Sequence, residues 1–499
     1  MYHMKTIVFI IFIAFLPPIS KTVLADDRPV TVRMTLQDAI SIAHQQSVDA
    51  VVALNELKTA YWQYRAYLAE QLPEVSFAGT LPAYNKTYNK YLQSDGSYTY
   101  LLTNNMGLNG DLSVKQNIPF TGGNISLNTS LDYTRQLGLD SYNEYMSVPV
   151  GITLNQPIFA VNDLKWQRRI EPLRYKEAKA AYIESVEEVT ITTISYFFGL
   201  LLAESNLQIA TQNHTHAEKL HEVAVAKRKI GYISESELMQ LDLNALQAKA
   251  LLTEAQSSLN ANMFRLRAFL GLSENDQIEP ALPESVPLVT ILYQTVLDKA
   301  QENNAFVKNI MRRQLEADYT VATAKGNMRS INLFASLGYT GKDRTFEQSY
   351  RNLVANQIVE VGVSIPIVDW GKRKGQLKVA ESNRDVVNSR TRQEQMNFNQ
   401  NIFLLVENFN NQSAQLNIAE EADIIAEKRY QTTIETFMIG RINVLDLNDA
   451  RNSKDEARRK HIEELHMFWN YFYRIRSITL YDFIKDTTLD AEFEEIVRD

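Results

Sequence analysis

The sequence predicts a mixed α and β protein, built from two internal repeats in which alternating strands lead into very long helices. Pro157 ends an alternating run, and Gly231 lies in a polar break 74 residues later. Pro366 and Gly440 repeat this pattern with the same separation, 209 residues further along. Such regular self-similarity indicates a duplication. Each segment between proline and glycine predicts a helix of about 70 residues, roughly 100 Å long at 1.5 Å per residue. A long tube needs helices of that length, whereas few compact folds use them.

Residues 1–25 have the pattern of a secretory signal peptide. Lys5 precedes an apolar run over 6–16, and the segment ends in the small-residue site VLA. The alternative is an uncleaved membrane anchor, although the run is short for a membrane span. The mature chain would begin near Asp26. Without Lys5 and Lys21 its formal charge would be −10 instead of −8, which argues against nucleic acid as a partner.

The composition narrows the class of protein further. There are no cysteines, which excludes disulfides, thiolate metal sites and cysteine nucleophiles. After the signal peptide no run of 18 consecutive apolar residues predicts a membrane-spanning helix. An exported chain of this kind is periplasmic, secreted or a β-barrel.

The strand pattern favours the barrel. Strict alternation of apolar with polar or small residues is typical of barrel strands about ten residues long, which turn one face to lipid and one to the lumen. Four such runs occupy 125–133, 148–154, 331–339 and 359–367, and two weaker ones occupy 75–83 and 108–118. The alternative is a soluble, half-buried sheet. We expect polar, tyrosine-rich loops such as 84–100 at one end of the strands and the short turn 119–123 at the other.

The remaining segments predict helices of similar length in the two repeats. They occupy 36–71, 162–230 and 234–271 in the first repeat, and 290–327, 372–439 and 442–481 in the second. Apolar or small residues spaced three and four apart from Leu238 onward indicate a coiled-coil seam. The first repeat spans 26–280, with strands within 75–158, and the second spans 281–481, with strands within 331–367. We expect the acidic tail, 482–499, to be poorly ordered.

The duplication has one irregularity. Ala43 corresponds to Ala300 with an offset of 257 residues, but beyond the strands the offset falls to 209. The first repeat therefore carries 48 additional residues between its first helix and the end of its strands, where the hairpin turn 119–123 lies.

These features resemble the TolC-like outer-membrane efflux family over nearly all of the mature chain. The carriers of the resemblance are the duplicated order, the strand-to-helix junctions NQPIF and SIPIV, and the helix turns RKIGYISESEL and FMIGRINVLDLNDA. The resemblance implies a homotrimer in the outer membrane of a Gram-negative bacterium. In it, one shared β-barrel is continued by an α-helical coiled-coil tunnel in the periplasm. It also implies a passive exit channel of a tripartite efflux system, supplied by an inner-membrane pump through a periplasmic adaptor.

Family members contribute four strands per protomer, or twelve in all. The 48 additional residues would either raise these numbers to six and eighteen or fold as an appendage, and the sequence leaves both open. The resemblance also implies that the tunnel tip contacts the adaptor. The corresponding residues here are Gly231 and Tyr232 in the first repeat and Gly440 and Arg441 in the second.

Two carboxylates after the second glycine turn are the candidate pore constriction. Asp446 and Asp449 are three residues apart and so share a helix face. Three copies would place six carboxylates around one opening, which would attract cations. The alternative is an ordinary solvated helix face. The resemblance assigns Glu237 as a possible closing contact at the tip. The residues around Gly440 depart from the family pattern, which indicates a different closing network.

The other candidate constellations are weak. His214, His216 and His221 do not have the spacing of a metal site, and no nucleotide-binding or catalytic motif is present. We predict no metal, no cofactor and no enzymatic activity. Two alternatives remain open at this stage. One is the same architecture serving type I protein secretion, and the other is a secreted coiled-coil structural or adhesive protein.

Overall fold

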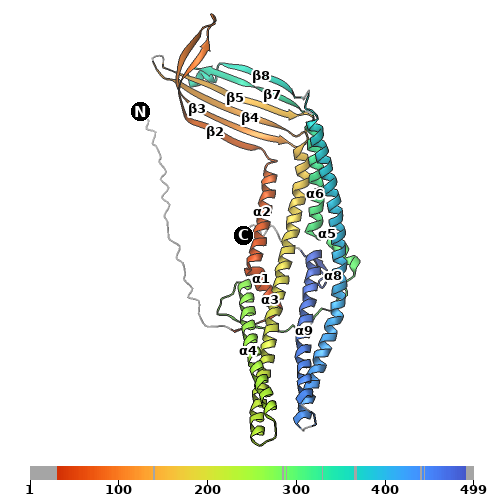
Figure 1. The fold of residues 1–499 in the computed structure, drawn as a ribbon. Coiled ribbons are helices and arrows are strands. Elements are labelled where there is room, and N and C mark those ends of the chain that lie inside the picture. The colour runs from red at the N-terminus through yellow and green to blue at the C-terminus, as the bar shows by residue number, and fades with distance from the viewer. Residues whose placement is uncertain are drawn as a thin grey trace, which may run out of the picture.

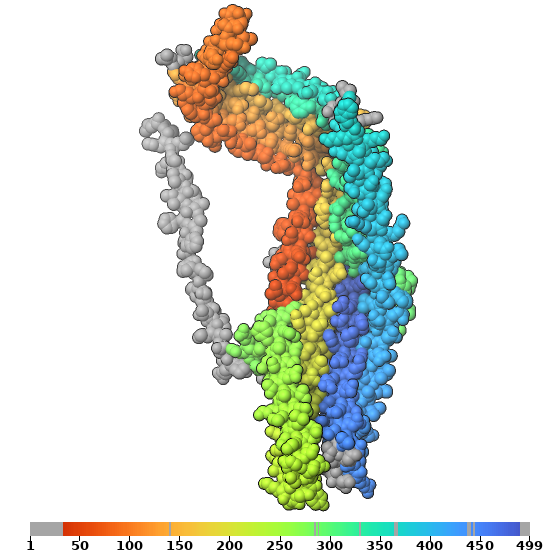
Figure 2. All heavy atoms as spheres, viewed as in Figure 1, coloured from red at the N-terminus to blue at the C-terminus, as the bar shows by residue number. Residues whose placement is uncertain are grey.

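The computed structural model describes residues 31–138, 141–283, 286–287, 289–328, 330–364, 368–438, 441–442 and 444–489. The predicted signal peptide, Pro366 and Gly440 lie outside the described residues. The chain forms two distinct parts, a column of long helices and a sheet at one end of the column (Figures 1 and 2). This arrangement confirms the mixed fold class, with its long helices and its strands.

The sheet has six antiparallel strands in the order β2-β3-β4-β5-β7-β8. The strands are β2 (Glu74–Leu92), β3 (Tyr98–Ile118), β4 (Gly123–Gln136), β5 (Tyr142–Pro157), β7 (Ser330–Asp343) and β8 (Leu353–Ser364). A short helix, α7 (Phe346–Ser349), lies between β7 and β8. Four strands therefore come from the first repeat and two from the second.

The expected loop over 84–100 is instead a continuation of β2 and β3. Asn85 pairs with Asn105 and Leu92 with Tyr98, so only 93–97 forms the turn. Tyrosine and threonine favour strands, and they pair across this hairpin as Tyr91 with Thr99. Since β4 begins to pair with β3 only at Asn105, the hairpin projects past the rest of the sheet (Figure 1).

The helices have equal lengths in the two repeats. In the first repeat they are α1 (Leu36–Gln46), α2 (Val48–Ala69), α3 (Asp163–Lys229) and α4 (Glu235–Leu270). In the second they are α5 (Tyr293–Asn303), α6 (Ala305–Gly326), α8 (Lys372–Met438) and α9 (Val444–Thr479). Both long helices have 67 residues. The starting residues of the first two helices are 257 positions apart between the repeats, and those of the last two helices are 209 positions apart. These are the two offsets found in the sequence.

The prediction of one unbroken helix over 36–71 and over 290–327 is wrong. Each is interrupted by one extended residue, Ser47 with φ −65° and ψ 144° and Asn304 with φ −62° and ψ 142°. The side-chain oxygen of each accepts a hydrogen bond from a backbone N–H at the start of the next helix, Ala50 N and Phe306 N respectively. Serine and asparagine are favoured at this capping position, so the chain bends at a residue that also starts a new helix.

The helices form a layer that changes composition along the column. Near the sheet, α2 packs on α3, α3 on α6 and α6 on α8. Farther away, α4 packs on α3, α3 on α9 and α9 on α8 (Figure 1). Four helices therefore lie side by side at both levels. In the first repeat α2, α1 and α4 follow one another along α3, and in the second α6, α5 and α9 follow one another along α8.

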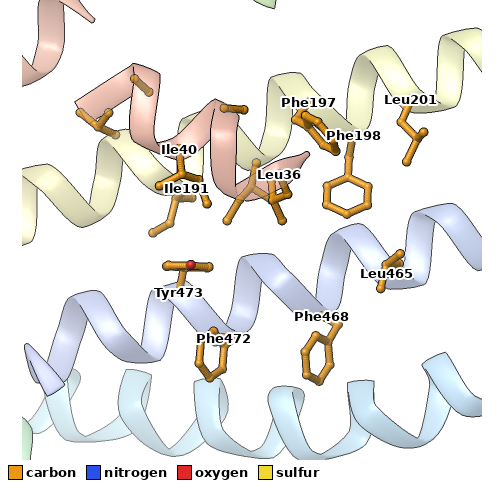
Figure 3. Packing of buried hydrophobic residues seen from close by; sticks show 14 of the residues in the cluster. Leu36, Ile40, Ile191, Phe197, Phe198, Leu201, Leu465, Phe468, Phe472 and Tyr473 are labelled. Carbon is orange, nitrogen blue, oxygen red and sulfur yellow. The ribbon is translucent and has the colours of Figure 1, made fainter. Parts of the chain in front are cut away.

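The largest apolar core lies midway along the column, where α1, α3, α8 and α9 meet (Figure 3). Phe197 and Phe198 of α3 and Phe468 of α9 are among the most completely buried side chains. Burial of each such side chain contributes about 1.5–3 kcal/mol. Helix α3 contains a stretch that is long and apolar enough to cross a membrane by composition alone, and most of that stretch is buried. Its apolar side chains pack into this core, as expected for a core helix.

Two small sheets complete the core region. Strand β1 (Thr31–Met34) pairs in parallel with β6 (Gln277–Pro280), next to the linker between the repeats. Strand β9 (Tyr481–Asp482) pairs with β10 (Thr487–Thr488). The expectation of a poorly ordered tail is therefore wrong for 482–489. Asp482 is buried and accepts a hydrogen bond from Arg476, which holds the start of the tail against α9.

Candidate pore wall and tunnel tip

One face of the six-stranded sheet is apolar across all six strands. Residues paired directly across antiparallel strands lie on the same face, and the pairing connects Val75 to Val114, Leu127, Ile152 and Leu337 in turn. The exposed large side chains on this face include Val75, Phe77, Leu112, Ile125, Leu127, Val150, Ile152, Leu337, Tyr339, Val359, Val361 and Val363. An exposed apolar face of this extent is the signature of strands that contact lipid.

The opposite face is polar. Ser76 and Ser113 are hydrogen-bonded across β2 and β3, with 2.9 Å between their Oγ atoms. The Asn109 amide donates to Asp132 across β3 and β4. The charged residues at positions on this face are Glu74, Asp111, Lys115, Asp132, Glu144, Lys342 and Glu360. A polar face with more acidic than basic residues suits the wall of a water-filled lumen.

The junction between sheet and helices is held by side-chain amides. Gln116 Nε2 donates to Gln71 O over 3.0 Å, and Asn117 Nδ2 to Glu70 O over 3.2 Å, so the end of β3 binds the end of α2. Asn162 caps α3 through Lys165 N and also donates to Pro119 O over 2.9 Å. The turn between β3 and β4 is therefore fixed to the N-cap residue of α3.

The turn between α3 and α4 forms the first tip of the column. Gly231 has φ 76°, a left-handed conformation that favours glycine, and the Tyr232 side chain is 80% exposed. Arg228 and Glu235 form an ion pair across the turn, with 3.0 Å between Nε and Oε2.

Glu237 has a local role at this tip. Its Oε2 atom accepts hydrogen bonds from Ser234 N over 2.7 Å and from Ser234 Oγ over 2.9 Å. This completes a capping box at the start of α4. The backbone hydrogen bond from Ser234 holds the pKa of Glu237 below its usual range.

The turn between α8 and α9 forms the second tip. Asp446 and Asp449 are exposed in the first two turns of α9, and Arg441 is exposed just before it. Arg429 of α8 donates to Asp449 Oδ2 over 2.6 Å and to Ser453 Oγ over 3.3 Å. Sequence reasoning missed Arg429. It lies twenty residues before Asp449, so only the antiparallel pairing of the two helices brings them together.

Comparison with protein families matches residues 124–272 and 296–465 to one family, the outer membrane efflux proteins. The chain belongs to this family. The two matched segments correspond to the two repeats, and together they span well over half of the chain. Membership supports the prediction that the chain is not an enzyme, and it excludes the alternative of a secreted structural coiled coil.

Solved outer-membrane proteins share the fold. The CmeC channel of Campylobacter jejuni superposes with a TM-score of 0.65 at 14% identity, covering 93% of this chain and 88% of CmeC. VceC of Vibrio cholerae superposes with a TM-score of 0.61 at 15% identity, covering 91% of this chain and 97% of VceC. The MtrE channel of Neisseria gonorrhoeae, solved in an open state, superposes with a TM-score of 0.58 at 14% identity, covering 89% of this chain and 88% of MtrE. No curated protein sequence matches the chain.

The family and the geometry together give the placement of the molecule. This outer membrane efflux protein is an efflux channel of the Gram-negative outer membrane, with its sheet in the membrane and its helices extending into the periplasm. Among the described residues, no group of histidine, aspartate and glutamate side chains is arranged to hold a metal. His214 lies near Glu218 and His221 near Asp242, each within a surface pair.

Proposed function

We propose that three copies of the chain form a passive exit channel, which receives its cargo from an inner-membrane pump through a periplasmic adaptor. The observation that carries this proposal is the continuity of the protomer. A sheet with an apolar outer face and a polar inner face leads directly into a four-helix layer that ends in two turns. Three such protomers would enclose one continuous duct from the periplasm to the outside.

In this proposal the second tip forms the constriction. Asp446 and Asp449 of three copies would surround the axis, and carboxylates around a narrow opening attract cations. Arg429 partly balances Asp449, so the charge at the opening depends on whether this pair is formed. Opening would require the tip helices to move apart, biased by the adaptor.

The test is ion selectivity of the purified channel in planar bilayers. Replacing both carboxylates, Asp446→Asn with Asp449→Asn, should lower the permeability of cations relative to anions. The matched control is Glu235→Gln, which removes a negative charge from the first tip and should leave selectivity nearly unchanged. Unchanged selectivity in the double variant would reject the constriction, and an equal shift in the control would show that the effect is not specific to the second tip.

The adaptor would contact the turns at both tips, through Gly231 and Tyr232 in the first and Gly440 and Arg441 in the second. Glu237 would also help to close the tip of the tunnel, in addition to capping α4. Tyr232→Ser and Arg441→Ala should reduce efflux of a toxic substrate from intact cells while channel abundance and bilayer conductance stay normal. A loss of conductance would instead place these residues in the pore.

A further inference from the structure

Among the residues that the structure describes, the first repeat contains two strands that have no counterpart in the second. In the first repeat, β2 follows α2 and β5 precedes α3. In the second, β7 follows α6 and β8 precedes α8. Strands β3 and β4 lie between β2 and β5 in the sheet and are not connected to a helix. We propose that β3 and β4 are part of the barrel wall, so that the channel is an eighteen-stranded barrel closed by β2 of one copy pairing with β8 of the next. This inference rests on the proposed trimeric channel.

The distribution of apolar side chains supports this assignment. Leu112 and Val114 of β3 and Ile125 and Leu127 of β4 lie on the same face as Ile152 of β5. An appendage in water would not need an apolar face that is in phase with the strands beside it. The polar faces are also in phase, since Ser113 and Asp132 lie opposite the apolar set.

The hydrogen bonding at the junction also makes β3 and β4 integral to the wall. Their connecting turn is bound by Asn162 at the start of α3 and by Gln156 of β5, whose Nε2 donates to Thr121 O over 3.0 Å. Close packing restricts Gly123 to glycine, because an added Cβ would lie 2.8 Å from the backbone oxygen of Asn155 in β5. An independent appendage would not require such close contact with the neighbouring strand.

The edge strands have the directions that closure requires. Strand β2 runs away from the helices because it follows α2, and β8 runs towards them because it precedes α8 (Figure 1). Joining β2 of one copy to β8 of the next therefore continues the antiparallel order around a closed barrel, which leaves no edge in the membrane.

Cross-linking tests the closure, since the chain has no native cysteines. Cysteine at Val75 in β2 is combined with cysteine at Val359, Val361 or Val363 in β8, and a short bismaleimide is added to intact outer membranes. At least one combination should give covalent trimers. The matched control places cysteine at Leu127 in β4 with the same three partners and should give none. Links from β4 to β8 of another copy would show that β2 and β3 lie outside the wall. Links from Val75 to a cysteine at Ile152 would show that β2 lies directly beside β5, so that β3 and β4 lie outside it. Either result would mean that only four strands form the wall.

Electron cryomicroscopy of the purified trimer counts the strands independently. Eighteen strands in the barrel wall would support the inference, and twelve would overturn it even if the trimer and its conductance are intact. A particle that is not a trimer would reject the proposed function itself, so the two failures can be distinguished.

Discussion

The two repeats have the same helices but different strands. Corresponding helices have 11, 22, 67 and 36 residues in each repeat, whereas the first repeat gives four strands to the sheet and the second gives two. Helix lengths are constrained because unequal helices would leave gaps in the column. A sheet can gain an antiparallel pair at one position without disturbing the strands on either side. The structure therefore indicates that the helical part restricts variation more than the barrel does.

The ion pairs differ between the repeats as well. Glu187 of α3 is buried and pairs with Arg476 of α9 through two hydrogen bonds of 3.0 Å. At the offset of 209, Glu187 corresponds to Met396, which is exposed, and Arg476 corresponds to Arg267, which donates to backbone carbonyl groups of 274 and 276. This asymmetric ion pair is one of the contacts that tie the first repeat to the second, together with the pair of Glu177 with Arg312.

The largest expected effect is on the diameter of the barrel, and it comes from giving the two repeats the same number of strands. Deleting 94–141 removes β3 and β4, the same 48 residues by which the first repeat is longer. The barrel should lose about a third of its diameter, because diameter grows roughly linearly with strand number. The size limit for polyethylene glycols entering from the outer mouth in bilayers should fall in proportion.

The control for this deletion shortens only the projecting hairpin. Replacing 86–104 with a two-residue turn leaves all six wall strands in place, so the polymer size limit should not change. If both deletions gave the same limit as the intact channel, β3 and β4 would not determine the width of the barrel.

The next largest effect concerns the contact between the repeats. Glu187→Leu should destabilise the protein by about 3–5 kcal/mol, because it leaves the largely buried guanidinium of Arg476 with Asp482 as its remaining carboxylate partner. Urea unfolding of the detergent-solubilised protein measures this. Glu381→Gln, which removes a surface pair with Lys378, is the control and should cost less than about 1 kcal/mol. Equal losses in the two variants would contradict the special role of Glu187.

A smaller effect is expected at the tips. At the offset of 209, Arg429 and Asp449 correspond to Leu220 and Gln240, so the charged pair is specific to the second tip. Arg429→Leu makes the two tips alike at this position and releases Asp449 from its partner. Cation preference in bilayers should therefore increase, opposite to the effect of Asp449→Asn. A decrease would indicate that Arg429 does not neutralise the opening.

The smallest effect is a local dependence on pH at the first tip. The pKa of Glu237 is lowered in the folded chain, so its capping contribution is complete above the ordinary pKa of about 4.5. That contribution is lost as the pH falls through the lower folded value. Amide hydrogen exchange at the start of α4 should therefore quicken in acid relative to the middle of the helix. Glu237→Gln keeps the cap and should remove this dependence; an unchanged dependence would assign it to another group.

Much of the fold follows from sequence periodicity, and the exceptions have physical reasons. The long helices and the strands beside Pro157 were predictable, since their patterns are regular and extend over many residues. The breaks at Ser47 and Asn304 were not, because a single capping residue interrupts the pattern without ending it. The paired strands over 84–100 were mistaken for a loop because both faces are polar there and alternation disappears.

The candidate site was predictable only in part. Asp446 and Asp449 are local in sequence, so their shared face follows from spacing. The partner of Asp449 and the contact between Glu187 and Arg476 depend on which helices pack together. The 48 additional residues were visible as a change of offset, but the hydrogen-bonded order of the sheet was needed to place them between β2 and β5.

The most direct test of the account is the mass of the particle that detergent extracts from the outer-membrane fraction. The account predicts that the mature chain stays in the membrane until detergent is added and then elutes as three copies in one particle. A water-soluble protein with the mass of one chain would contradict it, because a single protomer has six strands and cannot enclose a duct.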